Sequence, residues 1–226
     1  MKSKFCVIIP AYNVENTIVR VIEGVRETGC IHAIVVVDDG SFDATARLAQ
    51  AAHAIVIKNR SNQGKGYALK AGFRYAIENG YEAVICLDGD MQHSPGDIRA
   101  FVNCYLTKNP DMMIGSRMGD LSTMPWDRRF SNQTTSLIIS ILTGVRIRDS
   151  QSGYRLIKTR ALQRISLTSN RYETESELLI KVLMRKYKIM QLPIKTIYND
   201  QPSHIHRLTD TLRFLQIIFF SLIKKH

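Results

Sequence analysis

The chain has 226 residues, enough for one substantial domain or for one domain with a small appendage. Hydrophobic residues make up 45% of the sequence, which argues against a disordered chain. Lysine and arginine number 31 against 20 aspartates and glutamates, and the net charge of +11 favours an anionic partner: nucleic acid, a membrane surface or a phosphorylated small molecule.

The four cysteines are far apart in the sequence and show no metal-ligand spacing. A disulfide framework is not expected in a chain of this size, so we expect a reducing, cytoplasmic compartment. The first apolar run, at residues 5–9, is too short for the hydrophobic region of a signal peptide.

The first 116 residues alternate between two kinds of segment. Short apolar runs rich in branched residues predict strands at 5–9, 33–37, 54–57, 83–87 and 112–114. Segments with helical periodicity lie between them, at 15–28, 43–51, 65–79 and 96–107. Strands that alternate with helices predict right-handed crossovers and a parallel sheet, so we expect a doubly wound α/β fold.

The pattern changes after this half. Residues 117–135 are polar and basic and predict a loop that leads into a helix, and residues 136–145 form an almost continuous apolar stretch. The remaining expected elements are a strand at 154–157, a helix near 173–186 and a strand near 189–197. No linker interrupts the body of the chain, which we place at residues 1–205 as one unit.

Residues 206–226 are expected to form a separate C-terminal amphipathic helix, because leucine and phenylalanine recur there at helical spacing. Its apolar core falls short of the ~20 residues that span a bilayer. Three roles remain open for this helix: packing on the body, self-association, or lying on a membrane with Lys224 and Lys225 at anionic headgroups.

A polar or charged motif follows each of the five predicted strands. In chain order the motifs are PAYN (10–13), DDGS (38–41), NQGKG (62–66), DGDMQH (88–93) and GSR (115–117). Ligands bind beyond the carboxyl ends of the strands in such sheets, so the motifs are expected to meet at one edge. Their convergence indicates a site for a polar, charged ligand.

The motif Asp88-Gly89-Asp90 carries the clearest chemistry. Two carboxylates separated by one glycine on a turn can approach one cation, because glycine lets the backbone bend closely. Mg²⁺ and Mn²⁺ take few protein carboxylates and complete their shell with water and substrate phosphate oxygens, and Gln92 adds a further oxygen on the same rim. We therefore expect a divalent metal here, against the alternative of a solvated acidic turn.

Asp38 and Asp39 follow the second predicted strand. A carboxylate there can accept hydrogen bonds from a nucleobase or a ribose, or the motif can cap a helix through Ser41 or Asp43. Lys65 between two glycines could reach a phosphate. Its surroundings lack the pattern GxxxxGK[ST], which excludes a phosphate-loop nucleoside triphosphatase.

Together with DSQSGYR at 149–155, these motifs resemble, in order and spacing, those of the family-two inverting glycosyltransferases of GT-A fold. Within that family the chain is most similar to the dolichyl-phosphate mannose and polyprenyl-phosphate sugar synthases. The resemblance covers nearly the whole chain and implies a mostly parallel central sheet flanked by helices. It also implies a nucleotide-sugar donor carrying UDP or GDP.

The resemblance implies roles for particular residues. Pro10, Tyr12 and Asp39, with Asn13 beside them, would cradle the nucleoside, while Asp88, Asp90 and Gln92 would hold the metal and the diphosphate. Arg117 would face the phosphates, Arg128 and Ser131 would receive the acceptor's phosphate, and Arg207 would lie in a loop that closes over the donor. One departure is Val14, where the related synthases usually carry an acidic residue.

The acceptor decides what the catalytic residues must do. A hydroxyl acceptor needs a carboxylate base, and the candidates are Asp149, Glu173, Glu175 and Glu177. The three glutamates also suit the first turn of a helix, where the helix dipole favours acidic side chains. A lipid phosphate is already ionised near neutral pH and needs basic residues to position it. The arginines within 117–148, the apolar stretch and the net charge favour a polyprenyl or dolichyl phosphate at the cytoplasmic face of a membrane.

Two other functions fit part of this pattern. The first is transfer to a sugar hydroxyl in polysaccharide or glycolipid synthesis, which requires an indispensable carboxylate. The second is a basic nucleic-acid-binding domain, but aromatic and basic residues do not alternate, and acidic pairs line the edge where nucleic acid would lie. We therefore expect no nucleic-acid partner.

Overall fold

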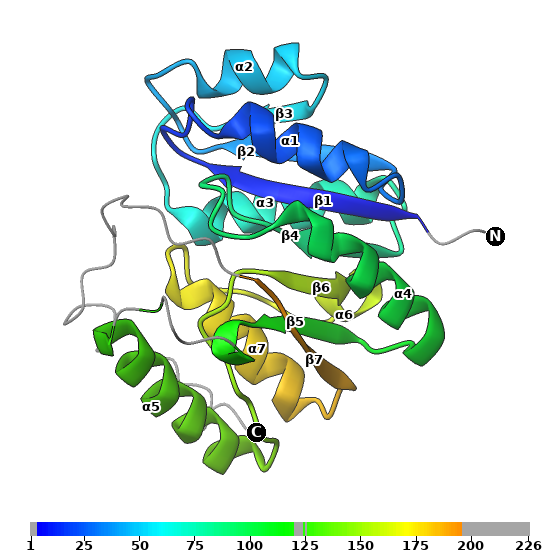
Figure 1. Ribbon diagram of the computed structural model, residues 1–226, viewed down its shortest axis with the longest axis vertical. Helices are drawn as coiled ribbons and strands as arrows, with labels where there is room; N and C mark the ends of the chain where they lie inside the picture. The colour runs from blue at the N-terminus through cyan, green and yellow to red at the C-terminus, as the bar shows by residue number, and fades with distance from the viewer. Residues whose placement is uncertain (1–3, 120–123, 125, 196–226) are drawn as a thin grey trace.

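One seven-stranded sheet organises the computed structural model, which describes residues 4–119, 124 and 126–195 (Figure 1). The strands are β1 (Phe5–Ala11), β2 (Ala33–Asp38), β3 (Ile55–Lys58), β4 (Ala83–Cys86), β5 (Met112–Ser116), β6 (Arg155–Lys158) and β7 (Ile189–Pro193). All but β6, whose sequence is RLIK, are mainly apolar runs that contain valine, isoleucine or methionine. The seven predicted strands are confirmed, with ends that differ by a few residues.

Helices connect the strands. They are α1 (Ile18–Glu27), α2 (Thr45–Ala51), α3 (Lys65–Glu78), α4 (Ile98–Lys108), α5 (Trp126–Thr143), α6 (Thr159–Leu162) and α7 (Glu173–Met184), with the short 3₁₀ turns η1 (Pro95–Asp97) and η2 (Arg117–Gly119). The sequence pattern did not predict α6. It also divided α5 into a loop and an apolar stretch, whereas residues 126–143 form one continuous helix.

The strand order is β3-β2-β1-β4-β6-β5-β7, and all neighbouring pairs are parallel except those of β6. Strand β6 is inserted between β4 and β5 and runs antiparallel to both. The amino end of β6 therefore lies at the edge where β1 to β5 have their carboxyl ends. This reversal brings the 149–154 loop to the edge that carries the other motifs.

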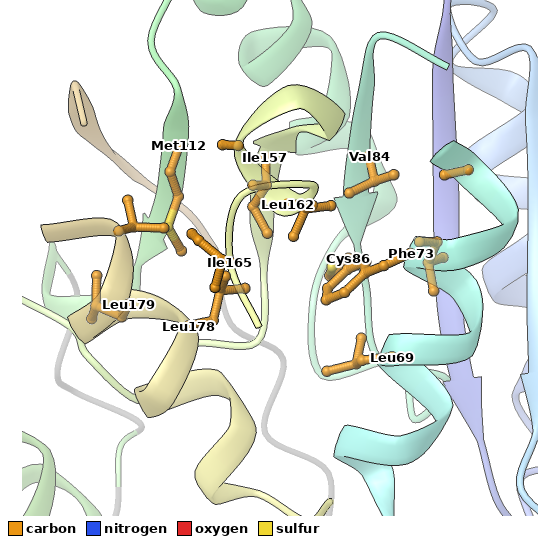
Figure 2. Close-up of a cluster of buried hydrophobic side chains, with 14 of the residues drawn as sticks. Leu69, Phe73, Val84, Cys86, Met112, Ile157, Leu162, Ile165, Leu178 and Leu179 are labelled. Carbon is orange, nitrogen blue, oxygen red and sulfur yellow. The ribbon is translucent and has the colours of Figure 1, made fainter. Parts of the chain in front are cut away.

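Hydrophobic side chains form a core on each face of the sheet. One core joins α1, α2 and α4 to the sheet, and the other joins α3, α6 and α7 to it. Figure 2 shows the second core, where Leu69 and Phe73 of α3 pack beside Cys86 of β4, with Leu178 and Leu179 of α7 lying on the far side of the cluster. The expected α/β fold with helices flanking a mostly parallel sheet is confirmed.

Helix α5 stands apart from the sheet and lies beside α7 (Figure 1). Its single fully buried apolar side chain among the residues described is Ile139. No helix in residues 4–119 and 126–195 combines the length and apolarity needed to cross a membrane. The predicted C-terminal segment at 206–226 lies outside the described residues.

Candidate active site

The loops that follow β1 and β2 are tied to each other. The Asn13 amide donates to Ser41 Oγ at 2.9 Å, and the Phe42 amide donates to Asn13 Oδ1 at 3.1 Å. Asn13 adopts a positive φ of 52°, a conformation that asparagine tolerates. Pro10 belongs to β1, and the half-exposed ring of Tyr12 meets Phe42 edge to face, with 6.0 Å between their centroids. The predicted nucleoside residues of this motif therefore lie on one braced rim.

The two aspartates after β2 have different partners. Asp39 is buried and accepts hydrogen bonds from Asn59 Nδ2 at 2.7 Å and from the amides of Gln63 and Gly64, the latter at 2.7 Å. Its carboxylate therefore holds the turn that precedes α3. Asp38 is fully buried and accepts from the Ser41 amide, while its Oδ2 has no hydrogen-bond partner among the described residues. Asp38 is thus the carboxylate of the pair with an unused acceptor.

The DGD turn is anchored by Thr17, the residue that directly precedes α1. Thr17 Oγ1 donates to the Gly89 carbonyl at 2.6 Å, and the Gln92 amide donates to Asp90 Oδ1 at 3.0 Å. Burial and the charge of Asp88 raise the pKa of Asp90. Burial alone would raise the pKa of Asp88 too, but the Lys65 ammonium beside it lowers that pKa below its ordinary value. The turn thus concentrates negative charge that a cation would stabilise.

The residues of this turn fit a magnesium-type or manganese-type ion. Within the described ranges, no group of three or more histidine, cysteine, aspartate and glutamate side chains is arranged to hold a metal. Mg²⁺ and Mn²⁺ nevertheless need only a few protein ligands when substrate phosphates complete their coordination shell. Two carboxylates and the side chain of Gln92 meet that need. Asp88, Asp90 and Gln92 are therefore the residues that would hold such an ion.

Lys65 lies between two carboxylates at the first turn of α3. Its Nζ is 2.7 Å from Asp88 Oδ1 and 3.1 Å from Glu175 Oε1, and it lies 5.9 Å from the centroid of the Tyr172 ring. Burial opposes the charged form, but Asp88 and then Glu175 raise the pKa of Lys65 above its ordinary value. The expected phosphate-binding lysine is thus an ion-paired cation directly beside the predicted metal ligand.

Arg117, directly after β5, is clamped by Asp149. The Arg117 side chain donates from Nε and Nη2 to the two Asp149 oxygens at 2.9 Å each, and its amide adds a third bond. Asn132 Nδ2 of α5 donates to the same carboxylate at 2.8 Å. Burial would raise the pKa of Asp149, but these bonds from Arg117 hold that pKa below its ordinary value. A fully buried, ion-paired carboxylate of this kind is weakly basic, and its geometry is that of an anchor for Arg117.

One face of α5 is attached to the loop that carries Asp149. Ser136 Oγ and Ser150 Oγ are 3.0 Å apart, and Gln151 Nε2 donates to Ser131 Oγ at 3.2 Å. Arg128 lies in the first turns of the same helix and is half-buried. The structure therefore places Ser131 beside the loop that carries Asp149, and Arg128 three positions earlier on the same helix.

The opposite face of α5 is apolar and exposed. Trp126, Phe130, Leu137 and Ile141 recur at intervals of four, seven and four residues, which places them on one stripe of the helix. Their exposed fractions are 79%, 61%, 60% and 72%, and the rings of Trp126 and Phe130 are stacked with centroids 6.0 Å apart. We call these four residues the α5 stripe. Large exposed apolar patches of this kind mark interaction surfaces.

The acidic residues at the start of α7 have separate environments. Glu177 accepts bonds from the Thr168 and Ser169 amides and hydroxyls and from Lys181 Nζ. Burial alone would raise the pKa of Glu177, but these hydrogen bonds lower it to about 2. Glu175 pairs with Lys65, and Glu173 has a buried Oε2 without a hydrogen-bond partner in the described part of the chain. Of the three, Glu173 retains the unused oxygen.

Two residues of the quoted motifs, Arg155 and His93, have structural roles that sequence reasoning did not assign. Arg155 is buried and donates to the carbonyls of Ser150, Ser152 and Glu175, so it ties the 149–154 loop to α7. A charged residue at the start of an apolar strand was the available signal. His93 is buried against Tyr154, and burial lowers its pKa to about 4, which keeps the ring neutral. Arg207 lies outside the described residues.

Comparison with known proteins gives concordant results. The model of the family described as Glycosyl transferase family 2 matches residues 6–166. An uncharacterized protein of Methanocaldococcus jannaschii is 35% identical over 229 residues, covering 99% of this chain and 93% of that protein. A UDP-N-acetylglucosamine–dolichyl-phosphate N-acetylglucosaminyltransferase of Methanococcus voltae is 33% identical over 215 residues, covering 85% of each chain.

Solved structures share the fold. Glucosyl-3-phosphoglycerate synthase from Mycobacterium tuberculosis, crystallised with Mn²⁺, UDP-glucose and phosphoglyceric acid, superposes with a TM-score of 0.76 at 20% identity. The match covers 97% of this chain and 80% of that one. At this level of identity the likeness concerns the fold.

Proposed function

The chain belongs to glycosyl transferase family 2, and from that premise we propose that it transfers a sugar from a UDP- or GDP-sugar to a polyprenyl or dolichyl phosphate, with inversion at the anomeric carbon. The site that carries the proposal is the carboxyl edge of the sheet. Donor residues surround the ends of β1, β2 and β4, and the acceptor residues lie beyond β5 on α5. The relative from Methanococcus voltae, whose name gives a dolichyl-phosphate acceptor, supports this choice.

The donor is held by residues of three loops. Tyr12 and Asn13 face the nucleoside, Asp38 offers its unused oxygen to it, and Asp39 acts indirectly by fixing the turn before α3. Asp88, Asp90 and Gln92 would hold an Mg²⁺ or Mn²⁺ ion, and through it the diphosphate. When bound, such an ion supplies charge neutralisation for the departing nucleoside diphosphate.

The reaction is a single displacement. An oxygen of the acceptor phosphate forms a bond to the anomeric carbon while the bond from that carbon to the diphosphate oxygen breaks, and the nucleoside diphosphate leaves with the electron pair. Arg117 stabilises the charge that develops, because Asp149 fixes its guanidinium before the substrate arrives. Arg128 positions the acceptor phosphate.

The observation that favours a phosphate acceptor is the pairing of the candidate bases. Asp149 is bound to Arg117 and Glu175 to Lys65, and the bonds to Glu177 hold its pKa near 2. A phosphate needs no base, since it is ionised at neutral pH. Glu173 favours the second candidate, transfer to a sugar hydroxyl, because its Oε2 is unpartnered within the described ranges.

Contact with a membrane surface is part of the proposal. The α5 stripe is apolar, and it lies on the same helix as the exposed Arg129 and the half-buried Arg128. An amphipathic helix with this composition binds at the interface of anionic bilayers. A lipid-linked acceptor would then enter from the side of the molecule that α5 covers.

The experiment that tests the function compares two acceptors that differ in one group. The full chain with Mn²⁺ is incubated with labelled UDP-N-acetylglucosamine, UDP-glucose or GDP-mannose and with polyprenyl phosphate or the matching polyprenol in detergent micelles. Label extracted into organic solvent with the phosphate but not with the alcohol is the expected result. Equal transfer to the alcohol, abolished by Glu173→Gln, would establish the hydroxyl alternative instead.

Donor binding is measured separately. Isothermal titration with UDP and with GDP, in Mn²⁺ and in EDTA, should give metal-dependent heat for one nucleotide in the wild type and none in Asp90→Ala. Absence of binding for both nucleotides in every condition would overturn the proposed donor site.

A further inference from the structure

Lys65 reaches the metal-binding turn because the start of α3 packs directly against the start of α7. The amide of Tyr67 donates to the Asn170 carbonyl at 2.9 Å. A Cβ on Gly66 would lie 1.8 Å from Thr174 Oγ1, so only glycine permits this approach. The contact fixes the first turn of α3 and directs the Lys65 side chain toward Asp88.

The third wall of this arrangement is the 149–154 loop. A Cβ on Gly153 would lie 2.9 Å from both Asp88 Oδ2 and Glu175 Oε1 and 3.0 Å from Lys65 Nζ. Three charged groups from three elements therefore converge over one glycine. The Lys65 side chain is 17% exposed, so its ammonium is largely screened from water by the groups that hold it.

A cation at Asp88 and Asp90 would have to share Asp88 with this ammonium. Lys65 already engages Asp88 Oδ1 at 2.7 Å, which leaves Oδ2 on the side of Gly153. Two positive charges within a few ångströms of each other repel strongly where water is excluded. Glu175 moderates this repulsion, because it neutralises part of the charge on Lys65 at 3.1 Å.

We propose that Lys65 is a built-in counter-cation of the Asp88 carboxylate that weakens binding of a divalent metal ion until a nucleoside diphosphate is present. This role rests on the proposed metal site at Asp88 and Asp90. In the free protein Lys65 neutralises Asp88 and competes with the metal. When the diphosphate arrives, its negative charge attracts Lys65 and the metal together and removes the competition.

Lys65 thereby couples the two ligands. Lys65 weakens metal binding when the nucleotide is absent and does so less when the nucleotide is bound. The nucleotide therefore strengthens metal binding, and the metal strengthens nucleotide binding by the same factor. Glu175 acts on the metal indirectly, through Lys65, and is a positioning residue in this scheme.

The test measures Mn²⁺ binding by isothermal titration, first with Mn²⁺ alone and then in saturating UDP or GDP. Lys65→Met keeps the length of the side chain and removes its charge. We expect it to bind Mn²⁺ alone roughly tenfold more tightly than the wild type, because a nearby positive charge is lost. The gain in Mn²⁺ affinity that the nucleotide produces should shrink correspondingly.

Glu175→Gln provides a change of opposite sign. It leaves the Lys65 charge less neutralised, so Mn²⁺ alone should bind severalfold more weakly. General damage to the fold would weaken binding in both variants, and opposite shifts distinguish the proposed role from that damage. If Lys65→Met does not fold, Glu175→Gln decides: unchanged or tighter Mn²⁺ binding overturns the inference.

Lys70→Met is the matched control, since it removes the same charge from the same helix at a residue that contacts Asn170. Its Mn²⁺ affinity should stay within about twofold of the wild type, because the charge is farther from the turn. Unchanged or weaker Mn²⁺ binding in Lys65→Met, with binding still lost in Asp90→Ala, would overturn the role of Lys65 alone. Mn²⁺ binding that Asp90→Ala does not alter would overturn the metal site and this inference together.

Discussion

The cluster around Arg117 and Lys65 and the helix α5 lie at the same side of the molecule but are held in different ways. Each charged group in the cluster has an oppositely charged partner inside the protein: Arg117 has Asp149, and Lys65 has Asp88 and Glu175. Helix α5 instead turns four large apolar side chains outward. The difference indicates that the protein itself holds the charged groups in place, while the described residues leave the apolar surface of α5 uncovered.

The largest expected effect comes from breaking the most buried ion pair. Asp149→Asn removes the negative charge that the Arg117 guanidinium contacts, and breaking a buried pair costs about 4 kcal/mol of unfolding free energy. Urea denaturation measures this loss. Glu78→Gln changes the charge equally at an exposed position and should leave the unfolding free energy almost unaltered. Equal stability of the two variants would show that the cluster is not braced as described.

The pH dependence of stability tests the same bracing at α7. The folded-state pKa of Glu177 is about 2, below its ordinary value of 4.5, so its contribution is complete above pH 4.5 and is lost as the pH falls toward 2. This shift corresponds to about 3 kcal/mol of unfolding free energy. Denaturation curves at several pH values should show Glu177→Gln less acid-sensitive than the wild type. Parallel curves for both proteins would contradict the assignment.

A smaller effect is expected where α3 meets α7. Gly66→Ala places a methyl group 1.8 Å from Thr174 Oγ1 and 2.7 Å from the Arg171 carbonyl, and such overpacking costs about 2 kcal/mol. Gly96→Ala is the control, because its new methyl group would meet only Ser94 Oγ, at 3.4 Å. A thermal melt of each variant should show a lower melting temperature for the first alone. Unaltered stability of Gly66→Ala would mean that the two helices can separate freely.

The smallest effect on stability is expected on the α5 stripe. Leu137→Ser should change the unfolding free energy by no more than about 0.5 kcal/mol, because the side chain is exposed. Ile139→Ser, two residues away and fully buried, should cost several times more. In sedimentation with anionic lipid vesicles, Leu137→Ser should bind the vesicles more weakly than Ile139→Ser does. Equal vesicle binding by Leu137→Ser and the wild type would show that α5 does not make the proposed membrane contact.

The fold was largely predictable because its signals are local. Apolar runs rich in branched residues alternated with helical segments, and each polar motif followed a run, so the strands and their common edge could be inferred. Helix α5 was divided into a loop and an apolar stretch because its exposed apolar stripe resembles a core segment in sequence. Periodicity alone does not say whether Leu137 faces the core or the outside.

The pairings within the site could not be predicted in the same way. Lys65 meets Glu175 and Asp39 holds the turn at Gly64 only after the chain has folded, and no spacing in the sequence records those distances. Asp149 was a candidate base by residue type, whereas its ion pair with Arg117 lowers its pKa. Residue chemistry identified which side chains gather at the edge, and long-range packing decides which of them are already engaged.

The antiparallel insertion of β6 has a consequence for the order in which the chain assembles. Strand β4 pairs with β6, whose residues follow some 70 positions later, and β5 acquires its place in the sheet only through the same strand. A chain growing from the ribosome can thus form the β3-β2-β1-β4 half early, with β4 as a temporary open edge. Such an edge is prone to pair with other chains until it is covered. Residues 155–158 therefore cover the open edge of β4, and substitutions that slow their docking should increase aggregation during synthesis even where the finished protein is stable.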